Sequence, residues 1–171
     1  MFISKTVYLF VSICVFTLSF IEFTKMSKLF LKNKYFKQFL VNCAFALYLF
    51  LFLLIFIIAI NDIHLKIVLF IILLICISSD IGGILFGKVF KGPKLTKISP
   101  QKTISGAFGS IFFSVIIINM FFYYLTDTFK INLIIISFIT SIGCQLGDLF
   151  FSYLKRKAKI KDTGNILPGH G

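Results

Sequence analysis

With 171 residues the chain is long enough for one domain, but 58% of those residues are hydrophobic. A soluble domain of this length does not need so much apolar surface, so the composition excludes an ordinary soluble protein and indicates a membrane protein. The formal net charge of +12 comes from basic residues between apolar runs. This placement favours an anionic membrane surface and phosphorylated substrates as partners over nucleic acid.

Five apolar runs are long enough to cross a bilayer as helices, each of which needs about 20 residues. The runs cover residues 7–23, 39–60, 67–86, 104–125 and 131–151. Because lipid does not tolerate unpaired strand edges, helices are expected rather than strands. The predicted fold class is all-α: a polytopic integral membrane protein with about five transmembrane helices and basic cytoplasmic loops.

The first run is the shortest, and because it follows Lys5 it could also be a cleavable signal peptide. It has no small-x-small cleavage site, however, and it ends in the sequence Ile-Glu-Phe-Thr-Lys. A retained helix is therefore the preferred interpretation.

The basic residues predict the orientation, since cytoplasmic loops hold lysine and arginine in excess. Fifteen of the 18 basic residues follow the first, third and fifth runs and so share one side of the membrane. The remaining three are Lys5, Lys66 and Lys130. We expect an N-terminus outside and a C-terminus in the cytoplasm, in a bacterial inner or plasma membrane.

The four cysteines lie in separate apolar runs, without C-x-x-C spacing, at Cys14, Cys43, Cys76 and Cys144. Neither a disulfide framework nor a zinc site fits this distribution. We predict that they are small buried hydrophobic side chains.

Of only six acidic residues, Asp80 and Asp148 lie inside or at the ends of the third and fifth runs. A carboxylate in the hydrocarbon costs about 3 kcal/mol, less near an end, and usually marks function. Carboxylate oxygens suit Mg²⁺, so both residues are candidate metal ligands. The alternative is that each pairs locally with a loop lysine such as Lys88 or Lys155.

Seven glycines cluster near the same ends of these runs. Close helix packing is the preferred reason, because small residues let helix backbones approach in a membrane. Approach of the backbone to a phosphate is the alternative. The glycines are Gly82, Gly83, Gly87, Gly106, Gly109, Gly143 and Gly147.

Four motifs follow one another in the second half of the chain. They are S-S-D-I-G-G at 78–83 with Phe86-Gly87, K-I-S-P-Q-K-T at 97–103 with Gly106, Q-L-G-D-L-F at 145–150, and the polar tail at 152–171. They resemble the S-D-T-G-A-Y-x-x-G, K-x-S-P-K-K-T-x-E-G, Q-L-G-D and S-x-x-K-R-x4-K-D-x-G-x-x-x-P-x-H-G-G-x-x-D-R-x-D segments of the phosphatidate cytidylyltransferase (CDP-diacylglycerol synthase) family. A single membrane domain is expected, with N-terminal spans in 1–75 and the motif region in 76–171.

The resemblance implies transfer of a cytidylyl group from CTP to phosphatidate, giving CDP-diacylglycerol and pyrophosphate in phospholipid biosynthesis. It implies Mg²⁺ as cofactor, CTP, phosphatidate and membrane lipid as partners, and no nucleic acid; a homodimer is left open. The implied catalytic residues are Asp148, Lys155, Arg156, Lys161 and Asp162. The implied substrate-binding residues are Ser79, Lys97, Ser99, Lys102, Thr103 and His170.

The chain departs from the family pattern in several places. It has neither the second glycine after His170-Gly171 nor the D-R-x-D segment. Ser105 stands where the family has glutamate. The N-terminal half also has fewer spans than that of most members. A fragment is the preferred reading, and we expect little or no activity from this chain alone. The alternative is a non-catalytic membrane scaffold or lipid-binding relative. A transporter would instead carry acids deep at the midplane.

Overall fold

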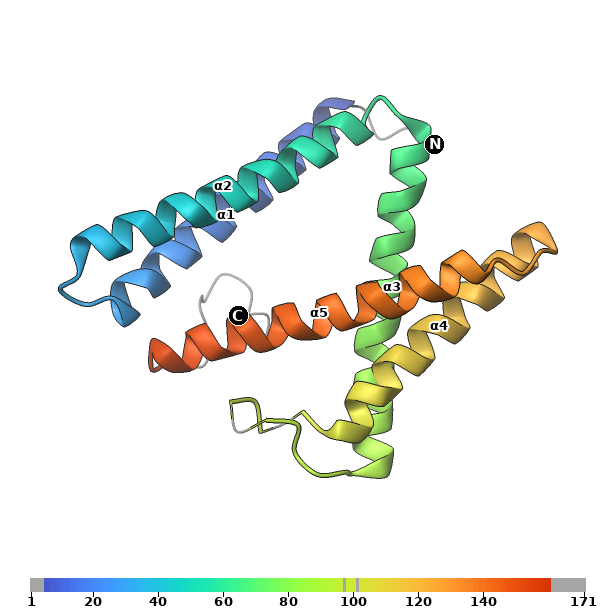
Figure 1. The fold of residues 1–171 in the computed structure, drawn as a ribbon. Helices are drawn as coiled ribbons and strands as arrows, with labels where there is room; N and C mark the ends of the chain where they lie inside the picture. Colours follow the sequence, from blue (N-terminus) through green and yellow to red (C-terminus); the bar gives the residue numbers. More distant parts are fainter. Residues whose placement is uncertain (1–4, 97, 101, 161–171) are drawn as a thin grey trace. The chain divides into compact units, whose positions relative to one another are not determined.

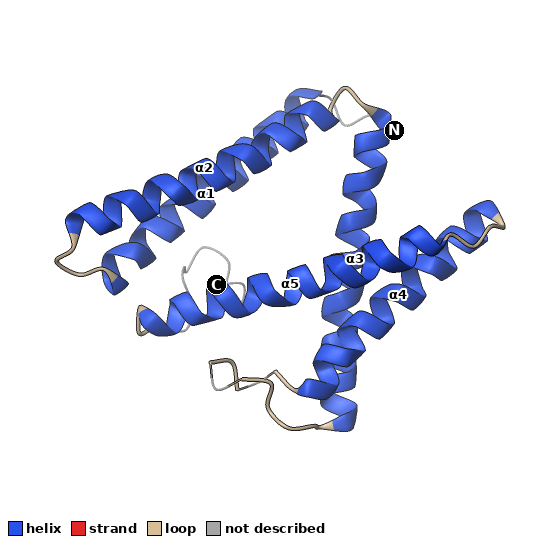
Figure 2. Cartoon of the chain, viewed as in Figure 1, coloured by secondary structure: helices blue, strands red, loops and turns tan. Residues whose placement is uncertain are grey.

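Five long helices make up almost all of the computed structural model, which describes residues 5–96, 98–100 and 102–160. The helices are α1 Lys5–Phe30, α2 Tyr35–Ala59, α3 Ile63–Phe90, α4 Ile104–Thr126 and α5 Ile131–Lys157. Among the described residues there is no strand beyond an isolated antiparallel bridge between Lys94 and Thr103 (Figure 2). The all-α prediction is confirmed.

Each of the five helices is long and apolar enough to cross a bilayer. The prediction of five spans in a polytopic integral membrane protein is therefore confirmed. The helices extend beyond the apolar runs, because only residues in the hydrocarbon have to be apolar. The first helix, for example, continues through Lys25 and Lys28 to Phe30, well past the predicted end at residue 23.

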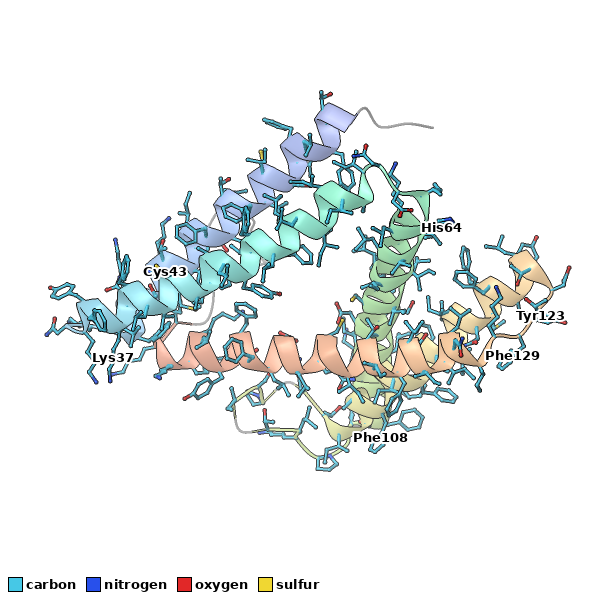
Figure 3. The ribbon with its side chains drawn as sticks, turned by 45° about the horizontal axis from the view of Figure 1, so that its top comes forward. Lys37, Cys43, His64, Phe108, Tyr123 and Phe129 are labelled. Carbon is cyan, nitrogen blue, oxygen red and sulfur yellow. The ribbon has the colours of Figure 1, made fainter. Side chains whose placement is uncertain are left out.

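Many large apolar side chains of the described residues, from all five helices, are exposed. Figure 3 shows Phe108 near the start of α4, Tyr123 near its end and Phe129 in the following connection; they are 72%, 55% and 65% exposed. Aromatic rings near both ends of a span are typical of the two membrane interfaces. This surface suits lipid as the surrounding solvent.

The chain forms two compact units. The first consists of Met1–Lys66 and Leu154–Gly171, and the second of Ile67–Tyr153. In the first unit α1 and α2 lie side by side and antiparallel (Figure 1). Phe23 of α1 stacks on Phe45 of α2 with ring centroids 3.7 Å apart. A small buried cluster joins them to the end of α5 through Phe23, Met26, Leu154 and Ala158.

The second unit is built from α3, α4 and α5, and α5 crosses α3 (Figure 1). Its apolar core is formed by one residue from each helix: Ile75, Ile118 and Leu133. Because this core is small, contacts between polar and small residues also hold the three helices together. The same contacts bring several of the sequence motifs close together.

Glycines allow α3 and α4 to touch through their backbones. A methyl group at Gly82 would lie 2.6 Å from the carbonyl oxygen of Gly109, and one at Gly106 would lie 2.8 Å from that of Gly83. Either distance is too short for a carbon atom, so only glycine fits this contact. The packing prediction is right for five of the seven glycines. It is wrong for Gly143 and Gly147 on α5, where an added methyl group would meet nothing within 4 Å.

Candidate functional site

Three of the sequence motifs meet where α3, α5 and the start of α4 come together. The hydroxyls of Ser79 on α3 and Ser141 on α5 are hydrogen-bonded at 2.8 Å. The side-chain amide of Gln145 on α5 donates to the carbonyl oxygen of Ala107 on α4 at 3.2 Å. Lys102, in the loop before α4, forms an ion pair with Asp148. Segments far apart in the sequence therefore form one site.

The loop between α3 and α4 has a defined backbone that presents Lys102. The amide of Leu95 donates to the carbonyl of Lys102 at 2.8 Å, and the amide of Ile104 donates to the carbonyl of Pro93 at 2.9 Å. These bonds flank the bridge between Lys94 and Thr103. Thr103 then caps α4, because its hydroxyl accepts the Gly106 amide at 3.1 Å. Lys102 is thus held directly beside a helix start.

Two carboxylates and one ammonium group make up the charged centre of the site. The side chain of Asp148 is 59% exposed and that of Lys102 is 29% exposed. Asp80, also exposed, interacts electrostatically with both Asp148 and Lys102. The alternative was local pairing with a loop lysine such as Lys88 or Lys155. The structure pairs Asp148 with a loop lysine, but with Lys102, which is far away in the sequence. Lys102 partly offsets the repulsion between the two acids.

This donor set suits some metal ions better than others. Across the described part of the chain, no group of three or more histidine, cysteine or acidic residues could hold a metal ion. Mg²⁺, by contrast, is usually bound by one or two carboxylates and completed by substrate phosphates. The pair of Asp80 and Asp148 fits that pattern.

Several predicted site residues have structural contacts. Ser79 is 1% exposed, and its hydroxyl is bonded to Ser141 between the helices. Thr103 caps α4. The amide of Ser99 donates to the hydroxyl of Thr96 at 3.2 Å, and its carbonyl accepts the amide of Lys102 at 3.1 Å. Substrate binding by Ser79, Ser99 and Thr103 stays a prediction.

Of the remaining predicted residues, two lie at the end of α5 and four lie outside the described residues. Lys155 and Arg156 lie in the last turn of α5, which belongs to the first unit. Four others lie outside the described residues: Lys97, Lys161, Asp162 and His170.

The contact between Cys76 on α3 and Cys144 on α5 was not predicted from the sequence; the two sulfurs are 2.7 Å apart. The prediction of four buried cysteines is wrong for Cys43, which is exposed, and the other three are only partly buried. A signal for the contact was present. Each of the two cysteines lies four residues before a motif aspartate, Asp80 or Asp148, and so on the same helix face.

Comparison with known proteins agrees with the motifs. The Cytidylyltransferase family model matches residues 1–171. A phosphatidate cytidylyltransferase of Rickettsia typhi is 45% identical over 102 residues, which cover 55% of this chain and 45% of the relative. An enzyme of the same name from Helicobacter pylori is 39% identical over 100 residues, which cover 58% of this chain and 37% of the relative. One from Staphylococcus aureus is 41% identical over 95 residues, which cover 54% of this chain and 36% of the relative.

The chain spans less than half the length of these curated relatives, and the matched part is about as long as the motif region. The family model, however, extends over all five helices and the junction between α3, α4 and α5. The protein is therefore a member of the cytidylyltransferase family.

Proposed function

We propose that this chain carries the nucleotidyl-transfer site of a phosphatidate cytidylyltransferase, which forms CDP-diacylglycerol and pyrophosphate from CTP and phosphatidate. The observation that carries the proposal is the ion pair between Lys102 and Asp148, because it joins two motifs beside Asp80. The names of the relatives support the same activity. They do not favour a non-catalytic scaffold.

The proposed reaction requires charge neutralisation more than acid or base chemistry. Phosphatidate is a phosphate monoester with a second pKa of about 6, so it is an anionic nucleophile without help from a base. Its approach to a triphosphate is opposed by repulsion, which positioned cations reduce. Lys102 is one such cation. Bound to Asp148 and Asp80, Mg²⁺ would supply further positive charge to the phosphates and orient them.

The other motif residues are proposed to extend this site. Lys155, Arg156 and Lys161 would add positive charge and Asp162 a further carboxylate. The substrate contacts are proposed for the remaining motif positions: Ser79, Lys97, Ser99, Thr103 and His170. The acyl chains of phosphatidate would lie between helices.

Activity should depend on the D-R-x-D segment of the family pattern, which follows the position of Gly171. The test compares the purified 171-residue chain with a version continued after Gly171 by a family-like G-x-x-D-R-x-D segment and a closing apolar helix. Pyrophosphate release from CTP is followed in one detergent, with and without phosphatidate and Mg²⁺. We expect the continued version to be at least about 100-fold faster, which corresponds to about 3 kcal/mol of transition-state stabilisation.

Two outcomes would change these proposals. The proposed function is contradicted if both versions are folded and neither releases pyrophosphate in the presence of phosphatidate. Equal, lipid-dependent rates would support the function but overturn the requirement for D-R-x-D, and would assign Asp80 a larger part in the metal site.

We also propose that the N-terminus is outside and the C-terminus is in the cytoplasm of a bacterial inner membrane. The proposal is supported by the excess of basic residues on one side, which includes Lys94 of the loop that presents Lys102. His64 is exposed at the start of α3, whereas the loop that contains Lys94 follows the other end of this helix (Figure 3).

The orientation is tested by single cysteine probes in a background with all four native cysteines replaced by serine. A membrane-impermeant maleimide applied to intact cells should label His64→Cys and leave Lys94→Cys unlabelled. Both positions should react after the cells are permeabilised. Labelling of the Lys94 probe alone in intact cells would reverse the orientation.

A further inference from the structure

Cys76 and Cys144 form a thiol pair between α3 and α5. Their sulfur atoms are 2.7 Å apart, and both side chains are half-buried free thiols. A disulfide bond is about 2.05 Å long, so small rotations of the two side chains would bring the sulfurs to bonding distance.

A second, independent contact fixes the alignment of the two helices at this point. Ser79 lies three residues after Cys76, and Ser141 lies three residues before Cys144; their hydroxyls are bonded at 2.8 Å. Ser79 and Ser141 are 1% and 0% exposed. This buried polar contact holds the α3 and α5 backbones at the crossing, and therefore also holds the thiols together.

We propose that Cys76 and Cys144 are an oxidisable dithiol site that closes to a disulfide and covalently joins α3 to α5. A peroxide is a sufficient oxidant. The first thiol sulfur attacks the O–O bond of hydrogen peroxide and becomes a sulfenic acid, releasing one water. The second thiol displaces the sulfenic hydroxyl, which leaves as another water as the S–S bond forms. Both sulfurs are oxidised by one electron and the peroxide accepts two.

The disulfide would also affect the charged centre, and that effect rests on the proposed function. Asp80 and Asp148 each lie four residues after a cysteine of the pair, on the same helix face. A covalent bond one turn away would fix the separation of the two carboxylates. Oxidation would therefore restrict any movement of α5 against α3 during turnover.

The experiment measures the bond and does not depend on catalysis. The full chain with Cys14→Ser and Cys43→Ser is treated with hydrogen peroxide in detergent and then with an excess of N-ethylmaleimide. Intact-mass analysis should show the monomer about 2 Da lighter and unalkylated at both remaining cysteines. Reduction before alkylation should restore two labels per chain.

Two matched variants test the geometry. Ile77→Cys in a Cys76→Ser background moves the thiol by one residue and rotates it by about 100° around α3. We expect its bond to Cys144 to form at least about tenfold more slowly than the native bond. Ser79→Cys with Ser141→Cys, in a background without native cysteines, should also cross-link, because the two hydroxyls are in contact.

Each result decides the proposal. Native cross-linking that exceeds that of the Ile77→Cys variant supports it. If the pair at positions 79 and 141 cross-links but Cys76 and Cys144 do not, the helices cross as described and the dithiol site is refuted. Failure of both pairs would refute the site together with the crossing. Loss or retention of CTP turnover has no influence on these results.

Discussion

Replacing Asp148 by asparagine should lower CTP turnover by at least about 100-fold in a version of the chain that is active. The substitution keeps the size and shape of the side chain but removes the charge that pairs with Lys102 and that would bind Mg²⁺. Loss of a metal ligand that acts in the transition state costs several kcal/mol, and about 3 kcal/mol corresponds to roughly 100-fold in rate. The measurement is initial pyrophosphate release under saturating Mg²⁺.

Asp127→Asn is the matched control for this substitution. Asp127 follows α4 in a left-handed conformation with a φ of 49°, which asparagine adopts readily, so stability should be retained. Its turnover should be close to that of the unmodified protein. If Asp148→Asn is as active as the Asp127→Asn control, Asp148 does not belong to the metal site.

Replacing Gly109 by alanine should destabilise the second unit strongly. The new methyl group would overlap the side chain of Phe86 on α3, so the two helices would have to move apart. Overpacking of this kind typically costs about 1–3 kcal/mol. We expect the apparent Tm in detergent to fall by about 5 °C or more.

Gly143→Ala provides the comparison within the same unit. An added methyl group there meets nothing within 4 Å, and alanine is a better helix former than glycine by about 1 kcal/mol. Its Tm should be unchanged or higher. A Gly109→Ala protein as stable as the Gly143→Ala protein would show that α4 does not pack closely against Phe86 of α3 at this position.

The helices were predictable because the bilayer imposes a minimum apolar length on every span. The third run, predicted at residues 67–86, lies within α3, which extends beyond it at both ends. Helix ends were harder to predict, since side chains outside the hydrocarbon need not be apolar. Lys88, for example, belongs to the last turn of α3.

The membership of the site was predictable in part, but its pairings were not. Motifs identified Asp80, Lys102 and Asp148 as candidates, whereas the choice of Lys102 as the partner of Asp148 depends on how the loop folds against α5. The glycines show the same limit. Gly109 and Gly143 look alike in sequence, yet only Gly109 faces a neighbouring helix. Tertiary packing decides both cases.

The contacts of the second unit also determine when the charged centre can form during biosynthesis. The α3 and α4 helices follow one another in the sequence and meet through Gly82 and Gly109, so they can pair as soon as α4 has entered the bilayer. The contact of Ser79 with Ser141 spans 62 residues, and that of Gln145 with Ala107 spans 38. Because the chain is synthesised from its N-terminus, these contacts must wait for α5. The nascent protein therefore carries Lys102 without its carboxylate partner until α5 has been inserted.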